Sequence, residues 1–322
     1  MRIVVLDGHV LNPGDVDWSP LKKLGKLTVY EDTSPDKLAE RVADQDVVLT
    51  NKVLLDAKTV PILAPHTRYI GVLATGYNTI ALQEYAAHNI PVCNVVAYGV
   101  DDVAQHVFAL ILELVRATRL HSDLIKNGAW TKNGQWCFWQ QPQLSLRNLV
   151  LGIIGFGNIG QAVGRLGHAF GMKIVALPPR NPVPAAYQPF AFQDKTTLLK
   201  NADILTLHCP LTEDTKFIIN QKTLALMKPS AILINTARGQ LLDEAAVAEA
   251  LHQRKLHALG VDVLSQEPPQ LNHPFFSTPN TLITPHIAWA TSNARQRIID
   301  LTAENIQNWL LGKPYNCVNG VA

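Results

Sequence analysis

Short apolar runs rich in β-branched residues alternate along the chain with amphipathic segments of helical spacing. The runs include residues 3–6, 47–50 and 231–236, and the helical segments include 34–45 and 243–255. Strands that are apolar throughout are buried on both faces, and their alternation with helices is typical of parallel sheets covered by helices. The pattern predicts an α/β protein with doubly wound parallel sheets, and the length of 322 residues suits two domains.

One segment interrupts this alternation. Residues 100–127 form a single long helical pattern whose middle, VFALILELV, is apolar on more than one face. A helix of this kind is buried on several sides. We expect it to cross between the two domains. Its excess apolar surface is then covered either by a second copy of the chain or by the core of its own domain.

A second long helical pattern, residues 291–312, follows the last predicted strand. We expect this C-terminal helix to pack back on the first domain, which makes the first domain discontinuous. The predicted first domain contains residues 1–98 together with 288–322, and the second contains 99–287.

The composition excludes several classes of function. Lys and Arg number 28 against 26 Asp and Glu, so the chain has no charge footprint for nucleic acid or an anionic membrane. No apolar stretch approaches the roughly 20 residues of a membrane span, and the N-terminus is predicted as a first strand, not a signal peptide. We therefore expect a cytoplasmic protein. Metal or redox spacing is absent from the four cysteines, Cys93, Cys137, Cys209 and Cys317.

A glycine pattern, Gly155, Gly157 and Gly160, follows an apolar strand and opens a helix. In this context the first glycine permits a tight turn, the second allows the backbone to approach a pyrophosphate, and the third allows close helix–strand packing. The start of the helix, at Asn158 and Ile159, presents free N–H groups and a positive dipole end to the phosphates. The pattern predicts a dinucleotide-binding site.

The next apolar run, residues 173–177, ends where an acid would hold the adenosine ribose hydroxyls in an NAD site. Pro178 occupies that place, and Arg180 follows. Without the carboxylate nothing repels a 2′-phosphate, and a guanidinium matches phosphate geometry. Arg180 therefore favours NADP(H). The alternative is a solvated arginine in a proline turn, with either cofactor accepted.

Three charged residues each follow a predicted strand in the last third of the chain: Arg238, Glu267 and His286. Ligands bind beyond the carboxyl ends of parallel strands, so these side chains are expected at one site. Their chemistry fits a redox reaction at a carbonyl. A histidine supplies the proton, a neighbouring carboxylate stabilises the imidazolium, and an arginine holds an acid substrate and polarises its carbonyl.

The motifs GFGNIGQAVGRLGHAFGMKIVA, INTARGQLLDEAAVAEAL, ALGVDVLSQEPP and TPHIAWAT resemble those of the D-isomer-specific 2-hydroxyacid dehydrogenases. The resemblance covers essentially the whole chain, and it implies two Rossmann-like domains, a discontinuous substrate domain and a cofactor domain. HIAWA, ATGYN and WCFW are most similar to the glycerate dehydrogenases, also called hydroxypyruvate reductases, within the family.

The resemblance also implies roles for individual residues. It makes Arg238 the substrate-binding arginine, Glu267 the carboxylate partner and His286 the acid/base. Asn158 and Ile159 match pyrophosphate contacts. The remaining implied contacts are Cys209, Thr236 and Asp262 around the nicotinamide, and Asn51, Lys52, Thr75 and Gly76 around the substrate.

Family members are usually dimers through the cofactor domain. Trp136, Phe138 and Trp139 follow the crossing helix. They are expected either to reach the partner subunit or its active site, or to form the dimer core.

The predicted function is NAD(P)H-dependent reduction of hydroxypyruvate or glyoxylate to D-glycerate or glycolate. A nicotinamide-sensing corepressor of similar sequence is the rival from another class, although such a protein would be expected to carry a long disordered tail. A phosphite-oxidising relative keeps the same three residues and stays open. Formate-oxidising relatives carry Gln where Glu267 stands, which argues against formate.

Overall fold

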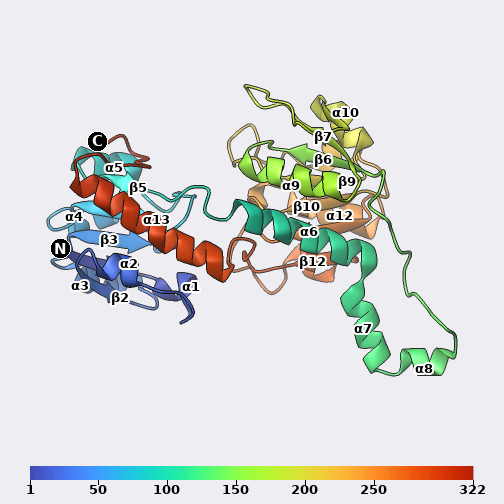
Figure 1. Ribbon diagram of the computed structural model, residues 1–322, viewed down its shortest axis with the longest axis horizontal. Helices are drawn as coiled ribbons and strands as arrows, with labels where there is room; N and C mark the ends of the chain where they lie inside the picture. Colours follow the sequence, from blue (N-terminus) through green and yellow to red (C-terminus); the bar gives the residue numbers. More distant parts are fainter. Residues whose placement is uncertain (322) are drawn as a thin grey trace. The chain divides into compact units, whose positions relative to one another are not determined.

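The structure is a computed structural model that describes residues 1–321 (Figure 1). The chain forms two compact units. One contains Met1–Gly99 and Trp289–Ala322, and the other contains Val100–Ala288. Each unit is an α/β fold around its own parallel sheet, which confirms the predicted fold class with its discontinuous first domain.

The first unit has a five-stranded parallel sheet in the order β2-β1-β3-β4-β5. The central strands β3 and β4 are buried along their whole length, as their uninterrupted apolar sequences predict. The strands are β1 (Arg2–Val5), β2 (Lys26–Val29), β3 (Val47–Thr50), β4 (Tyr69–Val72) and β5 (Val92–Cys93).

Helices cover both faces of this sheet because neighbouring strand residues point to opposite sides. Ile3 and Val5 of β1 pack with Ile298 of α13 (Ser292–Leu310), whereas Val4 packs on the other face with α3 (Leu38–Val42). The C-terminal helix α13 therefore belongs to the core of the first unit. The other helices of this unit are α1 (Gly8–Leu11), α2 (Ser19–Lys22), α4 (Val60–Leu63) and α5 (Leu82–Ala87), with 3-10 turns η1 (Pro35–Lys37) and η2 (Ala57–Thr59).

The second unit has a seven-stranded parallel sheet in the order β12-β11-β10-β9-β6-β7-β8. The strand order reverses at β6, which pairs with both β7 and β9, and ligands bind at such a switch point in doubly wound sheets. The strands are β6 (Val150–Ile154), β7 (Lys173–Ala176), β8 (Phe190–Phe192), β9 (Ile204–Leu207), β10 (Ile232–Asn235), β11 (Ala258–Val261) and β12 (Thr281–Ile283).

Helices pack on both faces of the second sheet, and a cluster of core residues lies at each face. On one face α6 (Val100–Arg116) and α9 (Asn158–Ala169) pack on the sheet through Val107, Ile111 and Val163. The other face is covered by α10 (Lys195–Asn201), α11 (Gln221–Leu224) and α12 (Glu244–His252). The remaining elements are α7 (Thr118–Lys126), α8 (Ala129–Asn133), η3 (Gly239–Leu241) and η4 (Pro274–Ser277).

The prediction of one helix over 100–127 was wrong. The helix breaks at Ala117, whose φ is +45°, and a new helix, α7, begins at Thr118. The Glu113 carboxylate accepts hydrogen bonds from the Thr118 hydroxyl at 2.6 Å and the Arg119 N–H at 3.1 Å, so it caps the second helix from the end of the first. The apolar residues of α6 are buried within the second unit, which supports the intrachain alternative for that helix.

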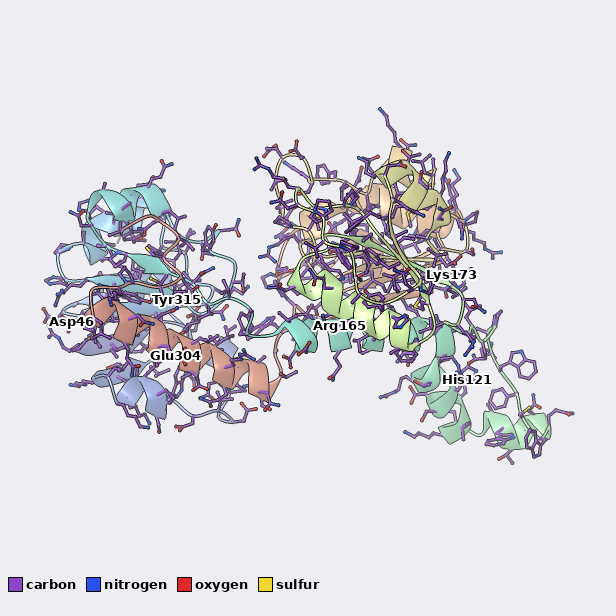
Figure 2. All side chains as sticks on the ribbon, turned by 45° about the horizontal axis from the view of Figure 1, so that its top comes forward. Asp46, His121, Arg165, Lys173, Glu304 and Tyr315 are labelled. Carbon is purple, nitrogen blue, oxygen red and sulfur yellow. The ribbon has the colours of Figure 1, made fainter. Side chains whose placement is uncertain are left out.

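Helices α7 and α8 project away from the body of the second unit (Figure 1). We refer to residues 118–144 as the arm. His121 lies on α7 within it (Figure 2). Several large apolar side chains of the arm are exposed, namely Leu120, Ile125, Trp130, Trp136, Trp139 and Leu144. None of the helices among residues 1–321 is both long and apolar enough to span a bilayer.

Candidate active site

The glycine loop connects β6 to α9. Gly155 has a φ of +97°, and a Cβ there would lie 2.3 Å from the backbone nitrogen of Cys209. A Cβ on Gly160 would lie 2.2 Å from the Gly155 oxygen. Both positions therefore require glycine. Gly157 differs, because a Cβ there would meet no atom within 4 Å. The loop is therefore tightly packed at Gly155 and Gly160 but leaves open space at Gly157. A phosphate group could occupy this space, next to the start of α9 at Asn158 and Ile159.

The adenosine end of this candidate site lies beyond β7. Pro178, Pro179 and Arg180 are exposed, directly after the strand and Leu177. Within residues 1–321, Arg180 makes no hydrogen bond or ion pair. Its guanidinium is thus available to an external anion.

Two further predicted cofactor contacts, Cys209 and Thr236, follow β9 and β10. The Thr236 hydroxyl is buried and has no hydrogen-bond partner within residues 1–321. An unsatisfied buried hydroxyl costs free energy, so this atom fits a site completed by a bound ligand. Burial raises the pKa of the Cys209 thiol, and burial lowers the pKa of His208 to about 3. His208 Nε2 lies 2.7 Å from the Thr206 hydroxyl. Both side chains are therefore neutral near pH 7. The open position at Gly157, the buried Thr236 hydroxyl and the neutral Cys209 thiol together suit the binding of a dinucleotide.

Glu267 and His286 are in direct contact. His286 Nδ1 lies 2.7 Å from Glu267 Oε2, and the Leu264 N–H donates to Glu267 Oε1 at 3.0 Å. Both side chains are partly exposed, at 27% for His286 and 37% for Glu267. The carboxylate faces Nδ1, and Nε2 lies on the other side of the imidazole ring.

The backbone of His286 has a φ of +58°, which is uncommon for a residue other than glycine. Buried Asp262 holds it there. The His286 N–H donates to the Asp262 carbonyl at 2.8 Å, and the Asp262 carboxylate accepts the N–H groups of Ile287 at 2.9 Å and Ala288 at 2.8 Å. The Thr284 hydroxyl also donates to Asp262 Oδ1, at 2.6 Å. Asp262 thus fixes the loop that carries His286.

His106 belongs to the same network, and the sequence analysis missed it. Its Nε2 lies 3.0 Å from the Thr284 hydroxyl and 3.6 Å from Asp262 Oδ1. A lone histidine on an apolar helix gives no signal in the sequence, because its partners, Asp262 and Thr284, follow strands far along the chain.

Arg238 follows β10, which pairs with β11, and β11 pairs with β12. The loops carrying the three charged residues therefore lie at the carboxyl ends of neighbouring parallel strands. A Cβ on Gly239 would lie 2.0 Å from the Leu264 carbonyl carbon, so the loop of Arg238 packs directly against the loop that leads to Glu267. Arg238 is half-buried, and its Nη1 donates to the Ala237 carbonyl at 2.6 Å.

The predicted substrate loops lie in the first unit, after β3 and β4. Asn51 is buried, and its Nδ2 donates to the Leu73 carbonyl at 2.9 Å; Lys52 is exposed. The Thr75 hydroxyl donates to the Val95 carbonyl at 2.9 Å. The backbone N–H groups of residues 75–78, which include Gly76, have no acceptor within residues 1–321. Such N–H groups suit a carboxylate.

No group of three or more His, Cys, Asp or Glu side chains in residues 1–321 is arranged to hold a metal ion. The arrangement of Arg238, Glu267 and His286 beside a dinucleotide-type loop instead suits proton transfer and anion binding at a carbonyl.

The family model described as "D-isomer specific 2-hydroxyacid dehydrogenase, NAD binding domain" matches residues 108–288. The chain is 39% identical to a hydroxypyruvate reductase of Blautia hydrogenotrophica, over 99% of this chain and 100% of that protein. It is 36% identical to a glycerate dehydrogenase of Methylorubrum extorquens, over 90% of each chain.

Solved structures give the same result for the fold. An acyclic imino acid reductase in complex with NADPH and D-Arg is 28% identical, with a TM-score of 0.81, over 99% of this chain and 100% of that chain. A D-2-hydroxyisocaproate dehydrogenase is 24% identical, with a TM-score of 0.86, over the same shares of the two chains.

Proposed function

The chain belongs to the D-isomer specific 2-hydroxyacid dehydrogenase family, and from this premise we propose that it reduces hydroxypyruvate or glyoxylate to the D-2-hydroxy acid. The contact between His286 Nδ1 and Glu267 Oε2 carries the proposal. It supplies a proton donor with a fixed charge partner, on the edge of a sheet that also bears a dinucleotide-type loop. The names of the two similar proteins support the choice of substrate.

A bound nicotinamide would supply the hydride that C2 of the keto acid accepts. His286 holds the proton at Nε2 and donates it to the carbonyl oxygen, which becomes the hydroxyl. Glu267 stabilises the imidazolium before the transfer. Arg238 binds the substrate carboxylate and polarises the carbonyl.

We propose that the backbone N–H groups of residues 75–78, which have no acceptor within residues 1–321, bind the substrate carboxylate, with Asn51 and Lys52 in the neighbouring loop. On the cofactor side, Asn158 and Ile159 bind the pyrophosphate, and Cys209, Thr236 and Asp262 line the nicotinamide half. We therefore propose that the domain formed by residues 1–98 and 288–322 binds the substrate. The domain formed by residues 99–287 binds the cofactor.

For the cofactor we propose a preference for NADP(H). The support is local: Pro178 stands where an acid would bind the ribose hydroxyls, and exposed Arg180 makes no ion pair within residues 1–321.

We also propose a homodimer formed through the second unit. The arm exposes Trp136 at 91% and Trp139 at 66%, and monomeric proteins rarely leave such clustered aromatic surface uncovered.

A panel of 2-keto acids assayed with NADH and NADPH tests the function. We expect the highest kcat/KM for hydroxypyruvate or glyoxylate, with the D-isomer of glycerate as product. The His286→Ala variant should lose at least about a hundredfold in kcat. Near wild-type turnover by that variant, or a clear preference for bulky keto acids, would contradict the proposal.

A further inference from the structure

A buried carboxylate lies beneath one of the proposed substrate loops. Asp7 follows β1 after one intervening residue, Leu6, and is only 2% exposed. Its two oxygens accept the N–H groups of three successive residues after β3. The Asn51 N–H lies 2.8 Å from Oδ1, the Val53 N–H lies 3.1 Å from Oδ2, and the Lys52 N–H donates to Oδ2 between them.

Burying a carboxylate costs free energy unless hydrogen bonds satisfy its oxygens. Burial raises the pKa of Asp7, while the hydrogen bonds from Lys52, Asn51 and Val53 act in the opposite direction. Three converging backbone N–H groups form a small anion-binding concavity, and here the chain fills it with its own carboxylate. The N–H groups of this loop are therefore used internally, in contrast to those of residues 75–78.

The hydrogen bonds continue along the carboxyl edge of the sheet. Asn51 Nδ2 donates to the Leu73 carbonyl at the end of β4. Asn94 Nδ2, beyond β5, donates to the Thr75 carbonyl at 2.7 Å. Asp7 thus anchors a chain of contacts that links the ends of β1, β3, β4 and β5 and contains both proposed substrate loops.

We propose that Asp7 is a positioning residue for substrate binding. It fixes the backbone of residues 51–53, and it occupies an anion site that would otherwise compete with residues 75–78 for the substrate carboxylate. The inference rests on the proposed function, because it assigns Asp7 to the substrate loops of that reaction. Because Asp7 is buried, its proposed role is to act through this loop and not by contact with the substrate or the cofactor.

The test compares Asp7→Asn with Asp46→Asn. An asparagine keeps the shape of Asp7 but loses the charge and part of the acceptor capacity. We expect its KM for hydroxypyruvate to rise about tenfold or more, while kcat and the KM for the nicotinamide cofactor stay within about twofold.

Asp46 is the matched control because it precedes the same strand, β3, at its opposite end (Figure 2). Its Oδ2 accepts one backbone N–H, from Arg2 at 2.6 Å. Asp46→Asn should lower the melting temperature without raising the KM for the keto acid. A KM rise in both variants, or in neither, would overturn the inference.

Hydrogen–deuterium exchange of the wild-type protein tests the hydrogen bonds between Asp7 and residues 51–53 without any variant. The amides of residues 51–53 should exchange much more slowly than those of residues 75–78, and equal rates would overturn the inference. The two proposals fail differently. A wild-type protein that turns over no 2-keto acid overturns both, whereas an active wild type with an unaffected Asp7→Asn variant overturns only the role of Asp7.

Discussion

At the scale of single residues, three carboxylates hold neighbouring groups in place. In the second unit Glu267 contacts His286, and Asp262 fixes the backbone beside that histidine. In the first unit Asp7 fixes the loop after β3, which we propose as a substrate loop. Two of these carboxylates are buried and satisfied by backbone N–H groups, whereas Glu267 is partly exposed beside His286. This difference in burial suits the proposed reaction, in which only the Glu267–His286 pair takes part in proton transfer.

The Glu267→Gln variant should reduce kcat and move the pH optimum for reduction downward. The amide can still contact His286 Nδ1, but the imidazolium loses the adjacent negative charge that stabilises it. A pH–rate profile measures the shift. Glu304→Gln, an exposed position on α13 (Figure 2), is the control and should leave the profile unchanged. An unchanged or upward-shifted optimum in Glu267→Gln would contradict the assigned pairing.

Arg180→Ala should raise the KM for NADPH at least about tenfold while changing the KM for NADH little, because only NADPH carries the 2′-phosphate. Steady-state kinetics with both cofactors measures the difference. Lys173→Ala is the matched control, since Lys173 is also exposed and basic but starts the strand, β7, that Arg180 follows (Figure 2). Equal effects on both cofactors would leave Arg180 as a solvated turn residue.

At the scale of elements, the site is made by loops that the sheet brings into contact. The loop after β10 and the loop after β11 approach so closely that Gly239 has no room for a side chain. The sequence predicted that Arg238 and Glu267 follow strands and lie at one site, but it did not indicate that the backbones of their loops touch at Gly239.

Gly239→Ala should therefore reduce kcat by about tenfold or more, because its Cβ would push against backbone atoms of Leu264 and Ser265 and displace the loop of Glu267. Gly152→Ala is the control: its Cβ would meet side chains only, those of Ala202, Leu198 and Leu205, so the strain falls on the packing of α10 and β9 and not on the loop of Glu267. Kinetics and thermal melts of both variants separate the two effects. We expect Gly152→Ala to lower the melting temperature and keep kcat, and similar kinetics in both variants would refute the role of Gly239.

At the scale of the whole molecule, the chain forms two units with separate cores, and its last helix belongs to the first of them. The arm of the second unit adds little to that core, since none of the residues of α7 or α8 is buried. Its exposed tryptophans are the strongest indication of a second chain.

We expect sedimentation at micromolar concentration to give about twice the 35.4 kDa mass of the chain. Replacing Trp136 and Trp139 together by alanine should shift the protein toward the monomer, because the arm would lose its largest apolar contact area. Leu271→Ala, at a 99% exposed residue outside the arm, is the control and should sediment as the wild type. A monomeric wild-type protein would disprove the proposed dimer.

The sequence by itself determined the α/β class, the glycine loop, and the charged residues that follow strands. These depend on local patterns, since apolar periodicity and glycine spacing can be read within a few residues. It missed the short edge strand β8, which follows Pro189, and the break at Ala117, which depends on the Glu113 side chain.

Only the tertiary structure decided which groups meet. Asp7 lies 44 residues from Asn51, and Asp262 lies 25 residues from Ile287. His106 and Thr284 are separated by 178 residues. Such partners are set by strand order and by the paths of the loops between strands. Local sequence does not encode that order, because many strand orders bury the same apolar faces equally well.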